Sequence, residues 1–99
     1  MHGCAYRRIL VKFEWDEHKA RINLRKHWVD FADAVTVLND DLAIVIPDET
    51  SAEERFVALG ADLMGRILVV EFVPRGQSIR IISARRATRG EAREYPVKQ

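Results

Sequence analysis

Short apolar runs alternate with helix-like periodic stretches along the chain, and this pattern predicts most of its elements. The run over residues 9–15 is rich in β-branched and aromatic residues, which is typical of a first strand. Asp16 follows it and predicts a helix over 17–27, because an aspartate carboxylate caps free N–H groups of a first turn. Three- and four-residue spacing places four residues on one face of that helix: Ala20, Asn23, Leu24 and His27.

Asp30 begins a second helix in the same way, and the polar residues at 39–41 end it. Its apolar stripe comprises Phe31, Ala34, Val35 and Leu38. The remaining pattern predicts strands over 42–46, 55–61, 66–73 and 78–84, separated by a polar loop at 47–54 and turns at 62–65 and 74–77. The strand at 66–73 is nearly continuous in apolar residues, as expected for a central strand covered on both faces.

A short helix is expected near the end of the chain, because Thr88 and Glu91 have the spacing of a capping box. We expect this helix to run through Tyr95. The predicted order is therefore β-α-α-β-β-β-β-α, in one domain over residues 1–99. Tight turns join the last three strands, so these should be antiparallel, with the two early helices on one face of the sheet. This is an α+β fold.

Composition adds the class and charge of the protein. Hydrophobic residues make up 47% of the chain, which is normal for a globular protein. The single cysteine, Cys4, excludes an internal disulfide framework and fits a reducing cytoplasm. The apolar runs are short and interrupted by charges, so we expect neither a membrane span nor a signal peptide.

The net charge of +1 hides an asymmetry along the chain. Residues 1–74 hold nine lysines and arginines against 13 acidic residues, whereas residues 75–99 hold seven against two. The last quarter is thus a basic patch on a mildly acidic body. Such a patch either attracts phosphates, with an affinity that weakens in salt, or is a solvated charged end of the chain.

The segments "FEWDEHKARINLRKHWVDFADAV", "ERFVALG", "GRILVVEFV" and "IRIISARRATRGEAREY" occur in an order that resembles the BrnT family of toxins. The resemblance covers residues 13–95, and "ISARRAT" with a following Glu and Tyr is its most specific part. It implies a type II toxin with a fold similar to the RelE ribonucleases, acting on RNA in the cytoplasm without a cofactor. It further implies a BrnA-like antitoxin partner, which binds DNA and represses the shared operon.

The chain departs from the family pattern at Trp28, where the family usually has glycine after Lys-His. A glycine at that position closes a helix in the left-handed conformation, which tryptophan adopts at a cost of order 1 kcal/mol. Either the first helix ends differently, or packing of the indole offsets the strain. Its large aromatic area favours partial burial.

RNA cleavage without a metal needs a base for the 2′-hydroxyl, a cation for the phosphate and an acid for the leaving oxygen. Strand alternation places Arg85 on the same face as Ile81, which should face the core. Arg85 is our first candidate for a phosphate clamp, because the arginine fork binds phosphate through two hydrogen bonds. The alternative is an arginine that pairs with a carboxylate at the core edge.

Three further residues are catalytic candidates, each with a structural alternative. Arg55 can join Arg85 across the sheet end or be surface charge. Glu91 can act as a base or serve only in the capping box. Tyr95 should lie on the same helix face as Glu91, and it can stack on a base, donate a proton or anchor the terminal helix.

The RNA-binding candidates are the other cations, with ordinary solvated charge as the alternative: Arg75, Arg80, Arg86, Arg89, Arg93, Lys19 and Lys26. His18 and His27 are general-base candidates by residue type, but a separation of nine residues places them on opposite sides of one helix. No metal-ligand spacing, phosphate-binding glycine loop or serine nucleophile motif is present in the sequence. Two functions stay open: an endoribonuclease toxin, or a non-catalytic module that binds nucleic acid or a partner through the basic patch.

Overall fold

The computed structural model describes residues 11–96 of the chain, and its elements follow the predicted order. They are β1 (Lys12–Glu14), α1 (Glu17–His27), α2 (Phe31–Leu38), β2 (Ile44–Pro47), β3 (Phe56–Ala61), β4 (Ile67–Arg75), β5 (Ser78–Arg86) and α3 (Arg89–Ala92). Asp16, Asp30 and Thr88 cap the three helices, and the capping box with Glu91 is formed. These parts of the sequence prediction are confirmed. Residues 9 and 10 of the expected first strand, and Cys4, lie outside the described residues.

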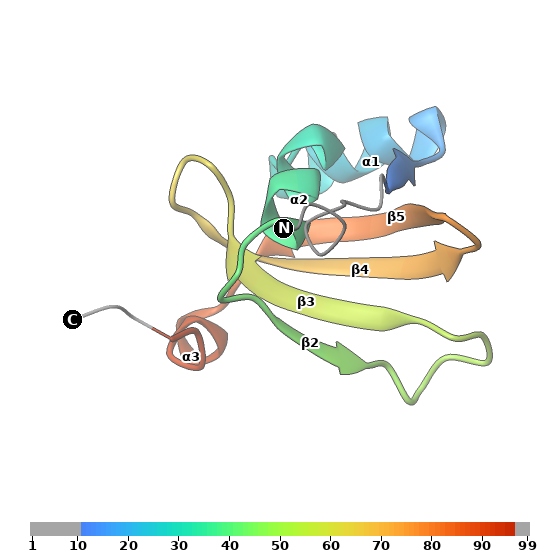
Figure 1. Cartoon of the computed structure of the whole chain (residues 1–99). Helices are drawn as coiled ribbons and strands as arrows, with labels where there is room; N and C mark the ends of the chain where they lie inside the picture. The colour runs from blue at the N-terminus through green and yellow to red at the C-terminus, as the bar shows by residue number, and fades with distance from the viewer. Residues whose placement is uncertain (1–10, 97–99) are drawn as a thin grey trace, which may run out of the picture.

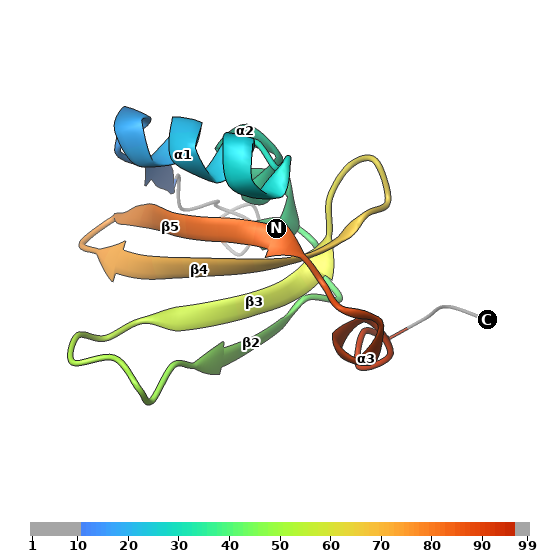
Figure 2. The ribbon, with the colours of Figure 1, turned by 180° about the vertical axis from the view of Figure 1, so that it is seen from behind.

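The strands form one five-stranded sheet in the order β1-β5-β4-β3-β2. The pairs β2–β3, β3–β4 and β4–β5 are antiparallel, while β1 runs parallel to the first part of β5. Helices α1 and α2 lie on one face of the sheet, as predicted, and α3 lies on the other side, near the end of β5 (Figures 1 and 2). We call the face away from α1 and α2 the open face.

The core fills the space between the sheet and the two early helices. Its buried members are Val29, Phe31, Ala34, Val37, Ala58, Leu68, Val70, Phe72, Ile81 and Ala84. Trp15 packs edge-on against Phe31, with ring centroids 6.0 Å apart. The expected stripe of α2 was wrong in one position, because Val37 is buried where Val35 is only half-buried. On α1, Leu24 is 44% exposed, whereas Asn23 is buried.

The strands β4 and β5 are longer than the pattern predicted. Pro74 and Arg75 still pair with β5, so the hairpin turns on only two residues, Gly76 and Gln77. Gly76 has φ 60°, a left-handed conformation that favours glycine. At the other end β5 continues through Arg86. The last helix is shorter than expected, because α3 ends at Ala92 and a turn carries the chain to Tyr95.

The central strand β4 is not covered on both faces, so that prediction was wrong. Leu68, Val70 and Phe72 are buried on the helix-covered face, in the core that includes α2, but Val69 and Glu71 alternate onto the open face and stay half-buried. Antiparallel sheets commonly have one covered and one solvated face, and here Val69 of β4 lines a groove on the side away from α1 and α2.

Asn23 joins α1 to β5 where β1 has ended. Its side-chain amide donates to the carbonyl of Ala84 at 2.8 Å, and its oxygen accepts from the Ala84 N–H at 3.1 Å. The same amide also donates to the Val29 carbonyl at 3.0 Å. One buried side chain thus supplies the hydrogen bonds that a neighbouring strand would give to β5, and it protects that edge.

Trp28 ends α1 in the left-handed conformation, with φ 62° and ψ 29°. It is 81% exposed, so the expectation of partial burial was wrong. The backbone keeps the shape that glycine would adopt, and packing does not offset the strain. Within the described residues, no helix is long and apolar enough to cross a membrane.

Candidate functional site

The open face holds a groove at its α3 end. Side chains of β2, β3 and β4 form an apolar floor, and two glutamates stand beside it on residues 89–95, which we call the α3 segment. The groove has a volume of about 320 Å³ and is lined by Ile44, Ile46, Val57, Leu59, Val69, Glu91 and Glu94. Two of the catalytic candidates border the same face: Arg55, directly before β3, and Arg85 of β5.

Arg85 reaches the open face because of an irregularity in the sheet. Glu71 pairs with Ser83 while the next residue, Phe72, pairs with Ile81, so Ile82 is an extra residue in β5. After the extra residue, each side chain of β5 points to the face opposite to the one that strict alternation predicts. Ile81 and Ala84 are therefore both buried on the helix side. The expected shared face of Ile81 and Arg85 was therefore wrong. Arg85 therefore lies on the open face, away from the core, and pairs with Val69 of β4.

A carboxylate of α3, not a buried row, fixes the Arg85 side chain. Its Nη1 and Nη2 donate to the two carboxylate oxygens of Glu91, each at 2.8 Å. Glu91 Oε1 also accepts from the Thr88 N–H at 2.9 Å, which ties the pair to the helix cap. The hydrogen bonds from Arg85, and then from Thr88, lower the pKa of Glu91 to about 2. The sequence analysis identified Arg85 and Glu91 as separate candidates, and in the structure they form an ion pair.

Arg55 lies on the same face as Arg85 but in its own network. Its Nη2 donates to Glu53 at 2.7 Å and its Nη1 to Glu71 at 3.4 Å. Glu71 in turn accepts from the Ser83 hydroxyl at 3.2 Å, two residues before Arg85. Arg55 Nε is buried without a hydrogen-bond partner among the described residues. The hydrogen bond with Glu53 raises the pKa of Arg55, so the guanidinium stays charged.

Tyr95 anchors the segment after α3. Its hydroxyl donates to Asp40 Oδ2 at 2.6 Å, and the same oxygen accepts from the Ala61 N–H at 2.9 Å. The hydrogen bond to Asp40 raises the pKa of Tyr95 to about 12. The α3 segment is therefore fastened twice, by Glu91 to β5 and by Tyr95 to Asp40, two residues after the end of α2.

The RNA-binding candidates divide into two groups. Arg80 pairs with Glu14 of β1 at 3.1 Å, on the open face. The others are exposed and take part in no ion pair within residues 11–96: Arg75, Arg86, Arg89, Arg93, Lys19 and Lys26. Lys19 and Lys26 line a hollow with His27 and with Ile82 and Ser83 of β5, while His18 is exposed at the start of α1.

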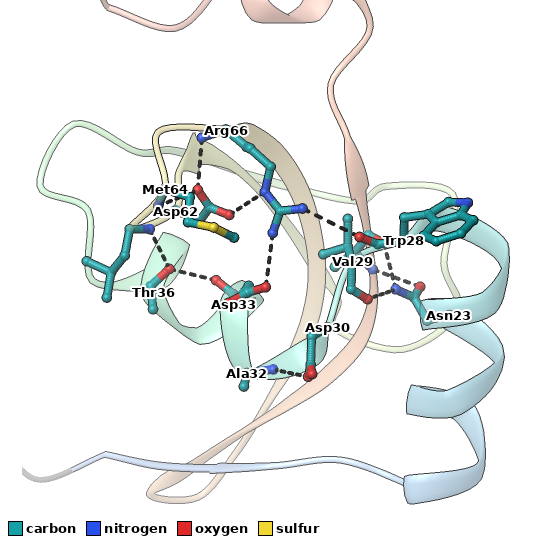
Figure 3. A network of polar contacts seen from close by, with 12 residues as sticks. Asn23, Trp28, Val29, Asp30, Ala32, Asp33, Thr36, Asp62, Met64 and Arg66 are labelled. Atoms are coloured by element: carbon teal, nitrogen blue, oxygen red, sulfur yellow. Dashed lines mark hydrogen bonds and ion pairs between the residues drawn. The ribbon is translucent and has the colours of Figure 1, made fainter.

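Sequence reasoning missed one network altogether. Arg66 donates to Asp62 at 2.8 Å, to Asp33 at 3.0 Å and to the Trp28 carbonyl at 3.4 Å (Figure 3). It ties the β3–β4 turn to α2 and to the end of α1. No local sequence pattern predicts this network, because Asp33 and Trp28 lie more than 30 residues from Arg66 in sequence.

The geometry defines a class of protein: a small α+β domain whose sheet has one helix-covered face and one open face bearing arginines. A family model described as the ribonuclease toxin BrnT of type II toxin–antitoxin systems matches residues 15–91. The chain therefore belongs to the BrnT family of ribonuclease toxins, and membership of a type II system implies an antitoxin partner and RNA as target.

A solved structure supports the same conclusion. The chain is 35% identical to the Brucella abortus ribonuclease toxin BrnT, whose crystal structure was determined at 1.1 Å resolution. The match covers 81% of this chain and 100% of the Brucella chain, with a TM-score of 0.67. No curated protein matches the chain. Among the described residues, no group of three or more His, Cys, Asp or Glu side chains is placed to hold a metal ion.

Proposed function

We propose that the protein is an endoribonuclease toxin that cuts RNA by metal-independent acid–base chemistry in the cytoplasm and so inhibits translation. The observation that carries this proposal is the oriented guanidinium of Arg85 beside an open groove. Glu91 occupies the two terminal nitrogens end-on, and Nε makes no hydrogen bond to the described residues. The edge formed by Nε and Nη2 is thus the one that can take two oxygens of a phosphate.

In this proposal Arg85 stabilises the charge that develops on the pentavalent phosphate. A cation that is already oriented needs no reorganisation at the moment of reaction, which is the condition for strong electrostatic catalysis. Arg55 supplies a second fixed cation on the same face, held by Glu53 and Glu71. The exposed cations Arg86, Arg89 and Arg93 raise the affinity for RNA without taking part in the chemistry.

The two acid–base candidates of the α3 segment fit positioning better than proton transfer. A carboxylate with a pKa of about 2 is a weak base at neutral pH. A phenol with a pKa of about 12, whose proton is held by Asp40, is a weak acid. We therefore assign to Glu91 the orientation of Arg85, and to Tyr95 the anchoring of α3.

We further propose that a BrnA-like antitoxin neutralises the toxin by covering the open face. Its contact with DNA would involve this chain only indirectly, through the antitoxin. Family membership supports a protein antitoxin, and the groove with its arginines offers such a partner both apolar surface and charge.

A second function is favoured by one observation: neither Glu91 nor Tyr95 has a pKa near neutrality. On that basis the open face could belong to a non-catalytic module that binds RNA or a protein. Induced expression in a bacterial host separates the two functions. Growth arrest with RNA cleavage supports the enzyme, and harmless accumulation of folded protein supports the module.

The test of the enzyme compares RNA cleavage by the purified wild type and three variants. Arg85→Ala should lower the rate by about 10²–10³-fold, the usual cost of removing one transition-state donor. Arg85→Lys should rescue poorly, because it keeps the charge and loses the two-pronged geometry. Arg89→Ala is the matched control and should only weaken binding. If a folded Arg85→Ala protein cuts RNA at the wild-type rate, the assignment of Arg85 is wrong.

A further inference from the structure

Helix α1 carries a group of cations that no carboxylate neutralises within the described residues. Four cations, Lys19, Arg21, Arg25 and Lys26, stand on it against one acidic residue, Glu17. None of the four takes part in an ion pair within residues 11–96. The arginines of the open face differ in this respect, because Arg55, Arg80 and Arg85 each have a carboxylate partner. The α1 cations therefore form a cationic surface on the helix-covered side of the sheet, separate from the unpaired Arg86, Arg89 and Arg93 near α3.

An aromatic ring stands at the end of this cationic helix. The backbone of Trp28 is held on both sides, because its N–H donates to the Leu24 carbonyl at 2.9 Å and its carbonyl accepts from Arg66 at 3.4 Å. Figure 3 shows the indole pointing away from this network, at the end of α1. A large apolar side chain in a strained conformation with 81% exposure gives nothing to the core. Because strained backbone conformations cluster at ligand-binding sites, this combination points to a role of the indole in binding.

The indole and the cations share one hollow. Arg21, Leu24, Arg25 and Trp28 line a shallow depression of about 470 Å³ on the outer side of α1. A second hollow, of about 270 Å³, lies between α1 and β5 and is lined in part by Lys19, Lys26 and His27. Cations thus flank the helix on both sides, and the flat ring marks one end.

We propose that this surface, which we call the α1 platform (Arg21, Leu24, Arg25 and Trp28), binds single-stranded RNA. A base stacks on the exposed indole, with Leu24 as an aliphatic wall, and Arg21 and Arg25 contact the neighbouring phosphates. Stacking of bases on aromatic side chains beside a cationic track is the general mode of single-strand binding, and it tolerates any sequence. The proposal rests on the proposed function in taking RNA as ligand, but the platform is separate from Arg85.

RNA fits the platform better than an acidic protein segment does. The apolar surface is small and consists of one ring and one leucine, whereas the cationic surface extends to Lys19 and Lys26 on the other flank. A stable protein interface needs a larger desolvated centre. A flexible polyanion needs only spaced cations and a ring on which to stack.

The experiment measures binding of a short 2′-O-methyl single-stranded RNA, which cannot be cleaved, by intrinsic fluorescence and by anisotropy of a labelled strand. We expect the RNA to quench emission from the exposed Trp28, while the half-buried Trp15 supplies a constant background. Trp28→Ala should weaken binding about tenfold, the typical effect of losing one stacked base, and Trp28→Phe should largely restore it. The same RNA annealed into a duplex should show no dependence on Trp28, because its bases are not free to stack.

The contribution of the two arginines of the platform is measured by the salt dependence of RNA affinity. Arg21→Gln combined with Arg25→Gln should reduce the slope of log affinity against log salt by about 1.4, since each phosphate contact on a single strand contributes about 0.7. Leu63→Ala is the matched control, because Leu63 is 88% exposed on the β3–β4 turn and lies outside the platform. It should leave affinity and slope unchanged.

Three outcomes decide the proposal. Wild-type affinity in both Trp28→Ala and the double arginine variant would overturn it. Unchanged RNA binding by Trp28→Ala together with lost antitoxin binding would also overturn it and make the platform a protein-docking site. If Arg85→Ala still cleaves RNA while the Trp28 and arginine variants bind it weakly, the proposed catalytic role falls and the α1 platform stands.

Discussion

Trp28 shows how one residue can oppose the stability of its own helix. The left-handed conformation closes α1, and glycine adopts it without the clash that a Cβ atom causes. The indole is exposed, so its removal costs little burial. Packing of the indole in the folded state therefore does not offset the free-energy cost of the strained backbone.

We expect Trp28→Gly to raise the free energy of unfolding by up to about 1 kcal/mol. Trp28→Ala is the control, because alanine keeps the strained Cβ and loses the indole, and it should bring no such gain. Urea denaturation followed by circular dichroism measures both. A loss of about 2 kcal/mol or more in the glycine variant would mean that the indole packs after all.

The ion pair of Arg85 and Glu91 makes a second residue-scale prediction, on pH. The folded pKa of Glu91 is about 2, below its ordinary value of 4.5, so its charge stabilises the fold above pH 4.5. That contribution is lost as the pH falls from 4.5 toward 2. Glu91→Gln keeps a side chain that suits a capping box, but it removes the charge and one of the two oxygens that accept from Arg85.

The wild type should therefore exceed Glu91→Gln in unfolding free energy at neutral pH, by at most about 1 kcal/mol, because an exposed pair is screened by solvent. The difference should shrink as the pH falls below 4.5. Urea melts at a series of pH values check this. A gap that is constant across the series would show that the charge of Glu91 does not stabilise the fold.

The sequence predicted the residue types of the site better than their placement. Arg85 and Glu91 were identified from position and capping pattern, but alternation put Arg85 on the core side. The extra residue at Ile82 reversed this, and a bulge depends on how two distant strands pair, which no local pattern encodes. The partner of Tyr95, Asp40, lies 55 residues away and was equally out of reach.

At the scale of elements, caps and turns were predictable and strand ends were not. Asp16, Asp30 and Thr88 begin helices through bonds to residues two or three positions on, so the signal is local. Pro74 and Arg75 belong to β4 only because β5 pairs with them. The short helix α3 likewise depends on distant contacts, since a helix of one turn is not stable by itself.

We therefore expect Tyr95→Phe to loosen α3 while the rest of the fold is kept. Phenylalanine retains the ring but loses the hydrogen bond to Asp40, and bonds to charged groups contribute about 1.5–3 kcal/mol. Trypsin should then cut faster after Arg89 and Arg93, which are exposed on this segment. Glu94→Gln is the control, because Glu94 makes no side-chain hydrogen bond within the described residues. Equal cleavage rates in the wild type and Tyr95→Phe would show that Tyr95 does not anchor α3.

For the whole molecule, the positive charge is distributed differently from what the sequence indicated, because part of the C-terminal charge is neutralised by ion pairs. The last quarter of the chain has a surplus of cations, yet Arg80 and Arg85 are paired with carboxylates, and Arg86, Arg89 and Arg93 remain exposed. The cations of α1 are equally free of ion pairs and lie on the opposite side of the sheet. The molecule thus has two separate cationic surfaces, and each can serve a different partner.

We expect the surface around α3 to take the antitoxin. Complementary charges mainly speed association, so an antitoxin with an acidic or apolar segment should bind fast at low salt and much more slowly near 1 M salt, where the Debye length is about 3 Å. A variant with Arg86→Gln, Arg89→Gln and Arg93→Gln should lose most of this salt dependence. The matched variant Arg21→Gln with Arg25→Gln, on the α1 platform, should keep it. Stopped-flow mixing with the protein encoded beside the toxin measures the association rates. If the two proteins fail to co-purify at low salt, or if the α1 variant alone slows association, the antitoxin does not use the α3 surface.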